Sequence, residues 1–135
     1  MVTHDEVRDE VRLAVPATPE FLRLARVTAS GLASRLKFSY DEVEDLRLAI
    51  DELCFALIGS RGRPGTVDIR YAVRADALEV VGVGNFDDDQ TDPMLASFSE
   101  QILTALVDDY AVYRDEQGKS AFRLVKRRQP VTDES

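Results

Sequence analysis

The chain has one cysteine, Cys54, and one histidine, His4, the two residue types that most often act as nucleophile, base or zinc ligand. Cys54 would need a neighbouring base to act as a nucleophile, because the thiolate is the reactive form. His4 lies near the start of the sequence, in a segment expected to fray, and one Cys with one His is too few for a zinc site. The sequence therefore predicts a buried packing role for Cys54 and no metal site. Glu52, two residues before Cys54, is a further residue whose side chain could do chemistry.

A helix is expected to position Glu52. Ser39 and Glu42 form an S-x-x-E capping box, which predicts a helix starting near Tyr40. Apolar residues then recur every three or four positions until Gly59, and they make one stripe: Val43, Leu46, Ile50, Leu53 and Leu57. Glu52 lies beside this stripe, where a carboxylate is most often a solvated flank.

The segment from Asp51 to Ile58, Asp-Glu-Leu-Cys-Phe-Ala-Leu-Ile, resembles the E-x-x-x-N helix of the serine-kinase anti-sigma factors of Gram-positive bacteria, a branch of the GHKL ATPases. In that family the Glu activates a water or a substrate hydroxyl, and the Asn holds the magnesium that bridges the phosphates. Glu52 matches the Glu, but Ala56 stands where the Asn is expected. An alanine methyl offers magnesium no oxygen ligand.

The resemblance runs from about Val11 to Arg128, and the second family motif is altered as well. The family's D-x-G-x-G is matched by Gly82-Val-Gly-Asn-Phe86, so Gly82 replaces the adenine-reading Asp and Gly84 is kept. The structural alternative is that both glycines mark a bulge at a strand end. The resemblance implies that Glu52 and Gly84 are remnants of a degenerate ATP site, with Glu52 catalytic only if kinase activity is retained.

The third family motif is a Gly-rich lid whose amides cradle phosphate. The matching region, from Asp92 to Glu100, has no glycine and contains acids that would repel phosphate. The acidic stretch from Asp87 to Pro93 is expected to be a solvated loop, and it lacks the spacing and glycine of a calcium-binding EF-hand. The sequence therefore predicts no bound cofactor, with Mg-ATP as the alternative.

Another candidate surface lies on the first predicted helix, which has Thr18 as its N-cap and Pro19 as its first residue and ends near Leu36. Basic and hydroxyl side chains share one face at three-to-four spacing: Arg23, Arg26, Ser30, Ser34 and Lys37. Phe21, Ala25, Leu32 and Leu36 are expected in part on the opposite face. An ordinary solvated face is the alternative to a binding surface.

In the resembling family, the start of this helix and an Arg within a pattern such as F-x-R-V contact both the sigma factor and its antagonist. The segment Phe21-Leu-Arg-Leu-Ala-Arg-Val27 carries that pattern most closely. The resemblance therefore implies partner-binding roles for Arg26, then Arg23, with Glu20 and Leu22. Three further apolar side chains, Leu22, Leu24 and Val27, belong either to a homodimer contact or to a wide core face.

Composition sets further limits. The 135 residues with 44% hydrophobic content fit a single domain, with residues 1–8 and 129–135 expected to be flexible. The net charge of −8 argues against direct nucleic-acid binding, and the basic triplet from Lys126 to Arg128 is expected to be a solvated end. No apolar run is long enough for a membrane span, and an acidic N-terminus is unlike a signal peptide, which predicts a cytoplasmic protein.

The expected elements place strands at 11–15, 67–73, 78–83, 110–113 and 120–126, and helices at 18–36, 40–58 and 97–108. This order predicts an α+β fold, a two-layer α/β sandwich with helices on one face of a mixed, mostly antiparallel sheet, which is also the GHKL (histidine-kinase-like ATPase) type.

The function implied is that of an anti-sigma factor that sequesters an RNA polymerase sigma factor and is countered by a STAS-type anti-anti-sigma protein, without ATP-dependent kinase activity. A homodimer is expected, with no direct contact to nucleic acid or membrane. The alternative is an active serine/threonine kinase of the same family that phosphorylates the anti-anti-sigma factor. A degenerate domain serving as a scaffold for another regulator is a third reading.

Overall fold

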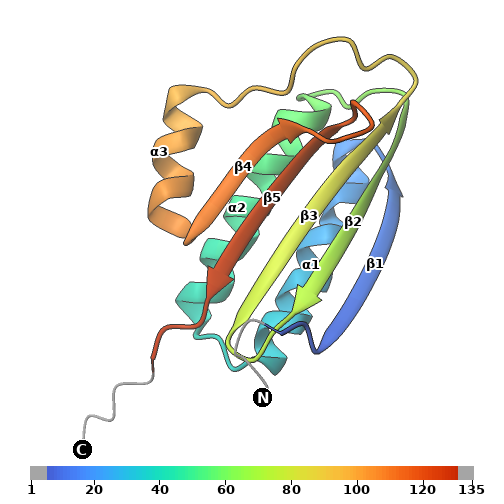
Figure 1. Ribbon diagram of the computed structural model, residues 1–135. Coiled ribbons are helices and arrows are strands. Elements are labelled where there is room, and N and C mark those ends of the chain that lie inside the picture. Colours follow the sequence, from blue (N-terminus) through green and yellow to red (C-terminus); the bar gives the residue numbers. More distant parts are fainter. Residues whose placement is uncertain (1–5, 131–135) are drawn as a thin grey trace, which may run out of the picture.

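The computed structural model describes residues 6–130, so His4 and the ends at 1–5 and 131–135 lie outside the described part (Figure 1). Its elements follow the predicted order: β1 (Asp9–Pro16), α1 (Pro19–Arg35), α2 (Tyr40–Ile58), β2 (Gly65–Val73), β3 (Ala77–Phe86), α3 (Ser97–Leu106), β4 (Asp109–Arg114) and β5 (Ser120–Arg127). The two-layer α+β sandwich is therefore confirmed, and it is consistent with the GHKL type.

All neighbouring strands of the sheet run antiparallel, in the order β1-β2-β3-β5-β4 (Figure 1). The expectation of a mixed sheet is wrong for the described strands. α3 carries the chain from the end of β3 to the edge strand β4, and the β4–β5 hairpin then returns β5 to lie beside β3. β1, β3 and β4 therefore run in one direction and β2 and β5 in the other, and no two strands of the same direction are neighbours.

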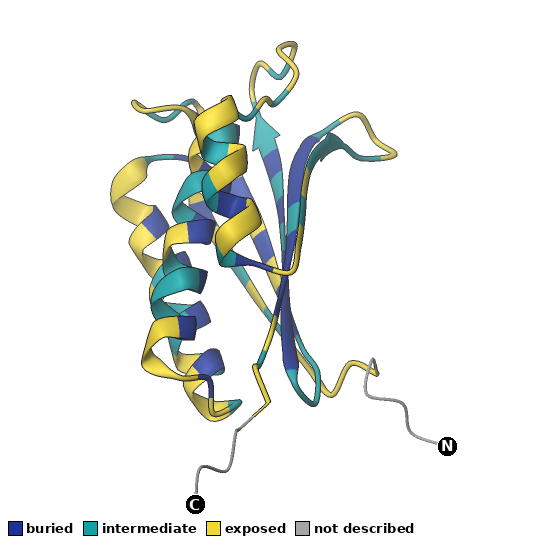
Figure 2. Ribbon diagram, turned by 90° about the vertical axis from the view of Figure 1, so that its left-hand side faces the viewer, coloured by how far each residue is buried: buried dark blue, intermediate teal, exposed yellow. Residues whose placement is uncertain are grey.

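The three helices cover one face of the sheet, and the core lies between the two layers (Figure 2). α1 approaches the sheet through small residues, with Ala25, Ala29 and Ala33 fully buried. The buried Tyr71 of β2 ties the layers together, because its hydroxyl donates a 2.9 Å hydrogen bond to the carbonyl of Ala25. Phe21, expected on the core side, is 42% exposed, because Leu22, ~100° further around the helix, takes that position.

The two long helices begin differently. Ser39 and Glu42 form the predicted capping box on α2, with the Glu42 amide donating to Ser39 Oγ at 3.1 Å and the Ser39 amide donating to Glu42 Oε1 at 2.7 Å. Thr18 occupies the N-cap position of α1, but its side chain makes no capping hydrogen bond. Pro19 compensates in part, because its preset φ suits the first helical position and it has no amide to satisfy.

Residues at and after the end of β5 form hydrogen bonds with the ends of helices. The Lys126 ammonium donates to the carbonyl of Leu106, the last residue of α3, at 2.6 Å. Arg128 donates to the carbonyl of Leu36, just past the end of α1, at 3.0 Å. The expectation of a solvated basic end is therefore wrong for these two cations, because the unpaired carbonyls and negative dipole ends of helices attract them.

Glu42 joins the start of α2 to the same segment. While one carboxylate oxygen accepts the Ser39 amide, the other accepts the Gln129 amide at 2.6 Å. Burial alone would raise the pKa of Glu42, but these amide hydrogen bonds and the charge of Lys126 lower it. Lys126, Arg128 and Gln129 together therefore contact the end or start of all three helices.

Candidate functional site

Helix α2 places Ala56 at a hollow of about 320 Å³ near its C-terminal end. The hollow is lined also by Gly59, Arg63, Asp92 and Ser120, which bring together the loop after α2, the acidic loop and the start of β5. Glu52 lies one turn before Ala56, half-buried and outside the described residues that line this hollow. Glu52 and Ala56, which match the Glu and the Asn of the E-x-x-x-N motif, thus lie on one side of α2. Of the two, only Ala56 lines the hollow.

The two glycines of the second motif pack against aromatic rings. The segment from Gly82 to Phe86 lies within β3, where its pairing with β2 continues without a bulge, so the bulge interpretation is wrong. A Cβ on Gly82 would fall 2.3 Å from the ring of Phe122, and one on Gly84 would fall 2.2 Å from the ring of Phe86. At both positions the lack of a side chain lets an aromatic ring lie close against the backbone of β3.

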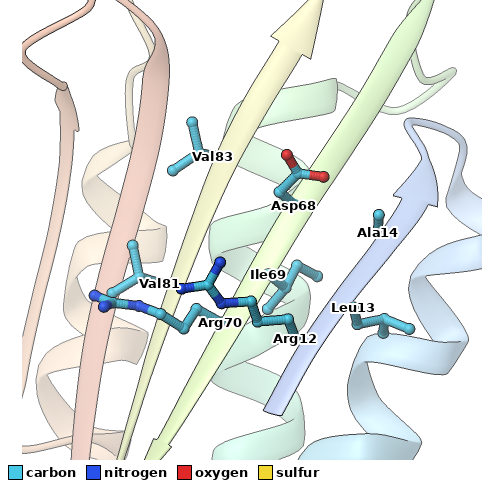
Figure 3. A pocket seen from close by; sticks show the side chains of 8 residues that line it. All are labelled: Arg12, Leu13, Ala14, Asp68, Ile69, Arg70, Val81 and Val83. Carbon is cyan, nitrogen blue, oxygen red and sulfur yellow. The ribbon is translucent and has the colours of Figure 1, made fainter. Parts of the chain in front are cut away.

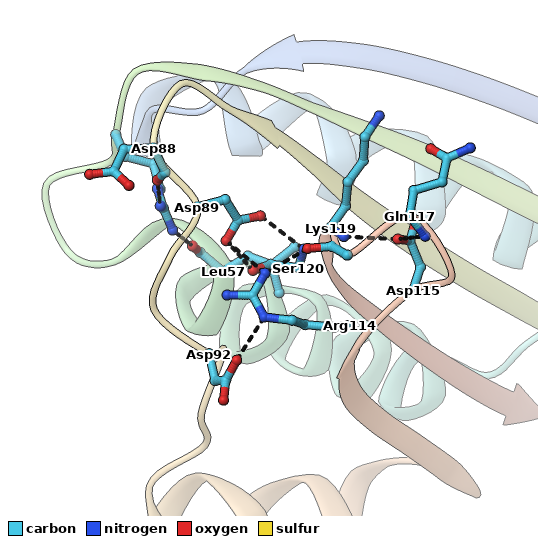
Figure 4. A network of polar contacts seen from close by, with 11 residues as sticks. Leu57, Asp88, Asp89, Asp92, Arg114, Asp115, Gln117, Lys119 and Ser120 are labelled. Carbon is cyan, nitrogen blue, oxygen red and sulfur yellow. Dashed lines mark hydrogen bonds and ion pairs between the residues drawn. The ribbon is translucent and has the colours of Figure 1, made fainter.

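The acidic loop after β3 is mostly exposed, as expected of a solvated loop, but hydrogen bonds and ion pairs also anchor it at several points (Figure 4). Asp89 accepts hydrogen bonds from the Ser120 hydroxyl at 2.6 Å and from its amide at 3.0 Å, and its Oδ1 lies 3.4 Å from Arg114. Arg114 also donates to Asp92 at 2.7 Å. The guanidinium of Arg63 donates to the carbonyl of Asp88.

These contacts set the charge state of the loop. Burial alone would raise the pKa of Asp89, but hydrogen bonds from Ser120 and the charges of Arg114 and Arg63 lower it below the ordinary range. Hydrogen bonding to Asp92 raises the pKa of Arg114. Asp89 therefore stays ionised and bound to Ser120 and Arg114 at neutral pH.

A magnesium nucleotide of the family's kind would need oxygen ligands here. Ala56 provides none, and the carboxylates of Asp89 and Asp92 are already bound to Arg114. Among residues 6–130, no group of three or more His, Cys, Asp or Glu side chains is arranged to hold a metal ion. This donor set does not fit the near-octahedral oxygen coordination of magnesium.

The sequence analysis missed Arg63, Arg114 and Ser120, which pair with the acidic loop. A signal for Arg114 existed: alternation along β4 places it on the same face as Tyr110 and Val112, so a cation ends an apolar row that faces the helix layer. Arg63 stacks over the ring of Phe86 at 4.0 Å, a contact between segments far apart in the sequence that no local pattern signals.

The predicted binding residues of α1 fall into different environments. Arg23 and Glu20 are exposed, whereas Leu22 is only 7% exposed and packs in the core, so its proposed contact with a partner is not available in this fold. Arg26 lies 3.1 Å from Asp51 and links α1 to α2. Burial raises the pKa of Asp51, although Arg26 and Arg47 oppose that effect.

The outer sides of the helices are largely exposed (Figure 2), and several of their exposed side chains are large and apolar. Leu24 is 47% exposed and Val27 is 59% exposed on α1. With further exposed apolar side chains of α2, of α3 and of the segment before α3, the set is Phe21, Leu24, Val27, Leu48, Phe55, Met94 and Phe98. We call this set the outer apolar surface.

The sheet face opposite the helices has a broad hollow of about 580 Å³ (Figure 3). Arg12 and Arg70 lie directly opposite each other on β1 and β2, and both approach Glu10, at 2.7 and 4.0 Å. The floor is apolar, with Val81 and Val83. These residues hold no nucleophile with an adjacent base, so the hollow is a charged surface feature with no arrangement for catalysis.

Cys54 is fully buried in the core, and burial raises the pKa of its thiol to about 12. Because the thiolate is the reactive form, the side chain packs as a small apolar group, as predicted from the sequence.

No helix of the described residues is both long and apolar enough to span a membrane.

No protein-family model matches the chain. Curated proteins named "Serine-protein kinase RsbW" do match it. The protein from Bacillus subtilis is 37% identical over 97 residues, which cover 67% of this chain and 61% of that protein. The protein from Bacillus pumilus is 37% identical over 91 residues, covering 62% and 56%. The protein from Listeria monocytogenes is 28% identical over 130 residues, covering 82% of this chain and 83% of its own length.

The alignments with the Bacillus proteins thus span about three fifths of those relatives' length. The Listeria alignment extends the similarity over most of both chains at lower identity. The motif resemblance and the pairwise similarities agree on one group of proteins. The chain is therefore a homologue of the RsbW serine-protein kinases.

Proposed function

We propose that this protein is an anti-sigma factor that binds an RNA polymerase sigma factor and releases it to a STAS-type anti-anti-sigma protein, without ATP-dependent phosphorylation. The observation that carries this proposal is Ala56, which lines the hollow at the end of α2 in a chain similar to the RsbW kinases. A methyl group at that position removes the magnesium ligand implied by the resemblance. Inhibition by occlusion of the sigma factor needs no such ligand.

Two further features, at the second motif and at the acidic loop, support the proposal. Gly82, where the resemblance implies the adenine-reading Asp, packs against Phe122. In the acidic loop, two carboxylates hold Arg114, which leaves this cation neutralised within the chain. These residues therefore take part in packing or in ion pairs within the chain, which supports a function that needs no bound nucleotide.

The proposed partner-binding surface is the exposed part of α1 with the neighbouring outer apolar surface. Arg23 is exposed beside it and can form a bidentate pair with a carboxylate of a partner. Arg26 is a weaker candidate than its sequence pattern implied, because it already pairs with Asp51. In this proposal the sigma factor and its antagonist compete for an overlapping surface in the cytoplasm, and the protein acts as a homodimer.

The second candidate function is an active serine/threonine kinase that phosphorylates the anti-anti-sigma protein. Two observations favour it: the relatives are named serine-protein kinases, and Glu52 keeps its place one turn before Ala56. Under this alternative, Glu52 is the general base and neighbouring groups replace the missing ligands.

The test combines nucleotide binding with sigma-factor binding. The purified protein is titrated with Mg-ATP by calorimetry, and its affinity for each sigma factor of its own organism is then measured with and without Mg-ATP. We expect no nucleotide heat up to about 1 mM, and tight binding of one sigma factor that Mg-ATP leaves unchanged. Micromolar nucleotide binding together with phosphate transfer to a STAS-type protein would establish the kinase alternative instead.

The binding surface is tested with Arg23→Glu and the matched control Arg12→Glu. Both replace an exposed arginine by an acid, but Arg12 lies on the opposite face of the sheet, with its side chain 79% exposed. We expect Arg23→Glu to weaken sigma-factor binding by at least about tenfold, and Arg12→Glu to leave it unchanged. Equal affinities for the two variants would refute the assignment to α1.

A further inference from the structure

The Asp89 carboxylate is bound as an external anion would be. Its Oδ2 accepts the Ser120 amide at 3.0 Å, its Oδ1 accepts the Ser120 hydroxyl at 2.6 Å, and the Arg114 guanidinium lies 3.4 Å from Oδ1 (Figure 4). Ser120 is 1% exposed, and the side chain of Asp89 is 14% exposed. A backbone amide, a hydroxyl and a guanidinium are the donors that proteins use for carboxylate and phosphate anions.

The donors of this cluster are fixed by the fold. Arg114 ends β4 opposite Ser120, the first residue of β5, so the hairpin pairing sets their separation. A further hydrogen bond from Arg114 to the Gly118 carbonyl, at 2.7 Å, orients the guanidinium. Arg63 adds a second cation, with hydrogen bonds to the carbonyls of Leu57 and Asp88. The donors would therefore stay in place if the acidic loop moved away.

The anion that meets these donors comes from the loop, which has little structure of its own. Residues 87–96 form no helix or strand, and their polar contacts with the hairpin are those of Asp89 and Asp92. Asp87, two residues before Asp89, is exposed, and its side chain has no hydrogen bond or ion pair in the described structure. The loop is thus held to the hairpin by particular carboxylates, and its negative charge alone does not explain the contact.

We propose that Arg114 and Ser120 form an anion-binding site whose resident ligand is the Asp89 carboxylate, and that this internal ligand excludes phosphate-class anions from the hollow beside Ala56. A tethered carboxylate competes at an effective concentration in the millimolar range or above, which a weakly bound free anion does not overcome. The proposal deepens the proposed function and rests on its nucleotide-independent form.

The test uses Asp89→Ala in the full chain, with Asp87→Ala as a control that removes the same charge from the same loop. Each protein is titrated with inorganic pyrophosphate by calorimetry at constant ionic strength. We expect no saturable heat up to about 10 mM for the parent and for Asp87→Ala, and binding with a Kd on the order of 1 mM for Asp89→Ala. Adding Arg114→Ala to Asp89→Ala is expected to abolish that binding.

Amide hydrogen exchange gives a second readout that does not depend on any ligand. We expect the Ser120 amide to exchange at least about tenfold faster in Asp89→Ala than in Asp87→Ala, because its acceptor is gone. If the alanine variant does not fold, Asp89→Asn, which keeps the side-chain shape but removes the charge, replaces it in the pyrophosphate titration only. Pyrophosphate binding by the parent as tight as by the variant, or no binding by a folded variant, would overturn the proposal.

Failure of this proposal can be told apart from failure of the proposed function. If the Asp89 variants bind no pyrophosphate while the parent binds a sigma factor without Mg-ATP, only the internal-ligand proposal is wrong. If the parent requires Mg-ATP for sigma-factor binding, the nucleotide-independent function is wrong, whatever the variants bind.

Discussion

The hollow at the end of α2 and the outer apolar surface differ in how their groups are paired. At the hollow, the carboxylate of Asp92 pairs with Arg114, and the backbone carbonyl of Leu57 accepts a hydrogen bond from Arg63. On the outer surface, Leu24, Val27 and Phe98 are between 47% and 62% exposed. A region whose groups satisfy each other has little left to offer a ligand, whereas exposed apolar area remains available to a partner.

This contrast is what the proposed function would require of the two regions. At the hollow, Asp92, Arg63 and Ser120 are bound by other groups of the chain itself. Exposed apolar side chains on helices cost stability nothing and gain free energy when a partner covers them. The predictions below test the two halves of this comparison, beginning with the largest effect.

The first prediction compares two phenylalanines. Phe122 is fully buried beneath Gly82, whereas Phe98 is 62% exposed at the start of α3. We expect Phe122→Ala to lower the free energy of unfolding by about 3–5 kcal/mol and Phe98→Ala to change it by less than about 0.5 kcal/mol. Urea unfolding measures both, and a Phe98→Ala loss similar to that of Phe122→Ala would mean that the outer surface belongs to the core.

The second prediction compares two glycines. An added Cβ at Gly82 would clash with Phe122, whereas Gly31 on α1 has no atom within 4 Å of that position. We expect Gly82→Ala to destabilise the protein by about 1–3 kcal/mol. Gly31→Ala is expected to stabilise it by about 0.5–1 kcal/mol, through helix propensity and a smaller unfolded-state entropy. Thermal unfolding measures both, and a neutral Gly82→Ala would remove the packing explanation for that glycine.

The third prediction concerns pH. The folded-state pKa of Asp89 is lowered by Ser120 and Arg114, so this carboxylate contributes stability above its unfolded pKa of about 4. That contribution is lost as the pH falls through the lower folded-state pKa. The difference in unfolding free energy between the parent and Asp89→Asn is therefore expected to be constant from about pH 7 to 5 and to shrink below about pH 4. Denaturant titrations at several pH values measure it, and a difference independent of pH would contradict the ionised loop.

The fourth prediction has the smallest effect on stability. Exchanging the partners of the ion pair between the helices, as Arg26→Asp with Asp51→Arg, keeps one cation and one anion at the α1–α2 contact, where the charges lie 3.1 Å apart in the parent. We expect unfolding free energies within about 0.5 kcal/mol of the parent, and a larger loss for Arg26→Asp alone. If the double variant also keeps its sigma-factor affinity, the Arg26 charge takes no part in partner binding.

Most of the fold could be predicted from the sequence because its signals are local. The capping box at Ser39, the alternation in β1 and β2, and the turn from Asp115 to Gly118 each arise from a few adjacent residues. The direction of the strands in the sheet could not be predicted as well. It depends on β5 being placed between β3 and β4, which no residue pattern within a single strand specifies.

The candidate site could be predicted only in part, for the same reason. The absence of a ligand oxygen at Ala56 is visible in the sequence, but its consequence is not, because the pairing of Asp89 with Ser120 joins residues 31 positions apart. Likewise, the exposure of Phe21 and the burial of Leu22 depend on how α1 is rotated against the sheet. A rotation of one residue exchanges the two, and helical spacing alone leaves both possible.

The segment from Lys126 to Gln129 has a consequence for the order of folding. Its contacts with the helix ends close loops of up to 92 residues, as in the hydrogen bond from Arg128 to Leu36, and Gln129 closes one of 87 residues to Glu42. Such long closures cost chain entropy before they contribute any stability, so these contacts form only after the hairpins and helices they connect. Loss of this segment's contacts should therefore speed unfolding while leaving the rate of folding almost unchanged.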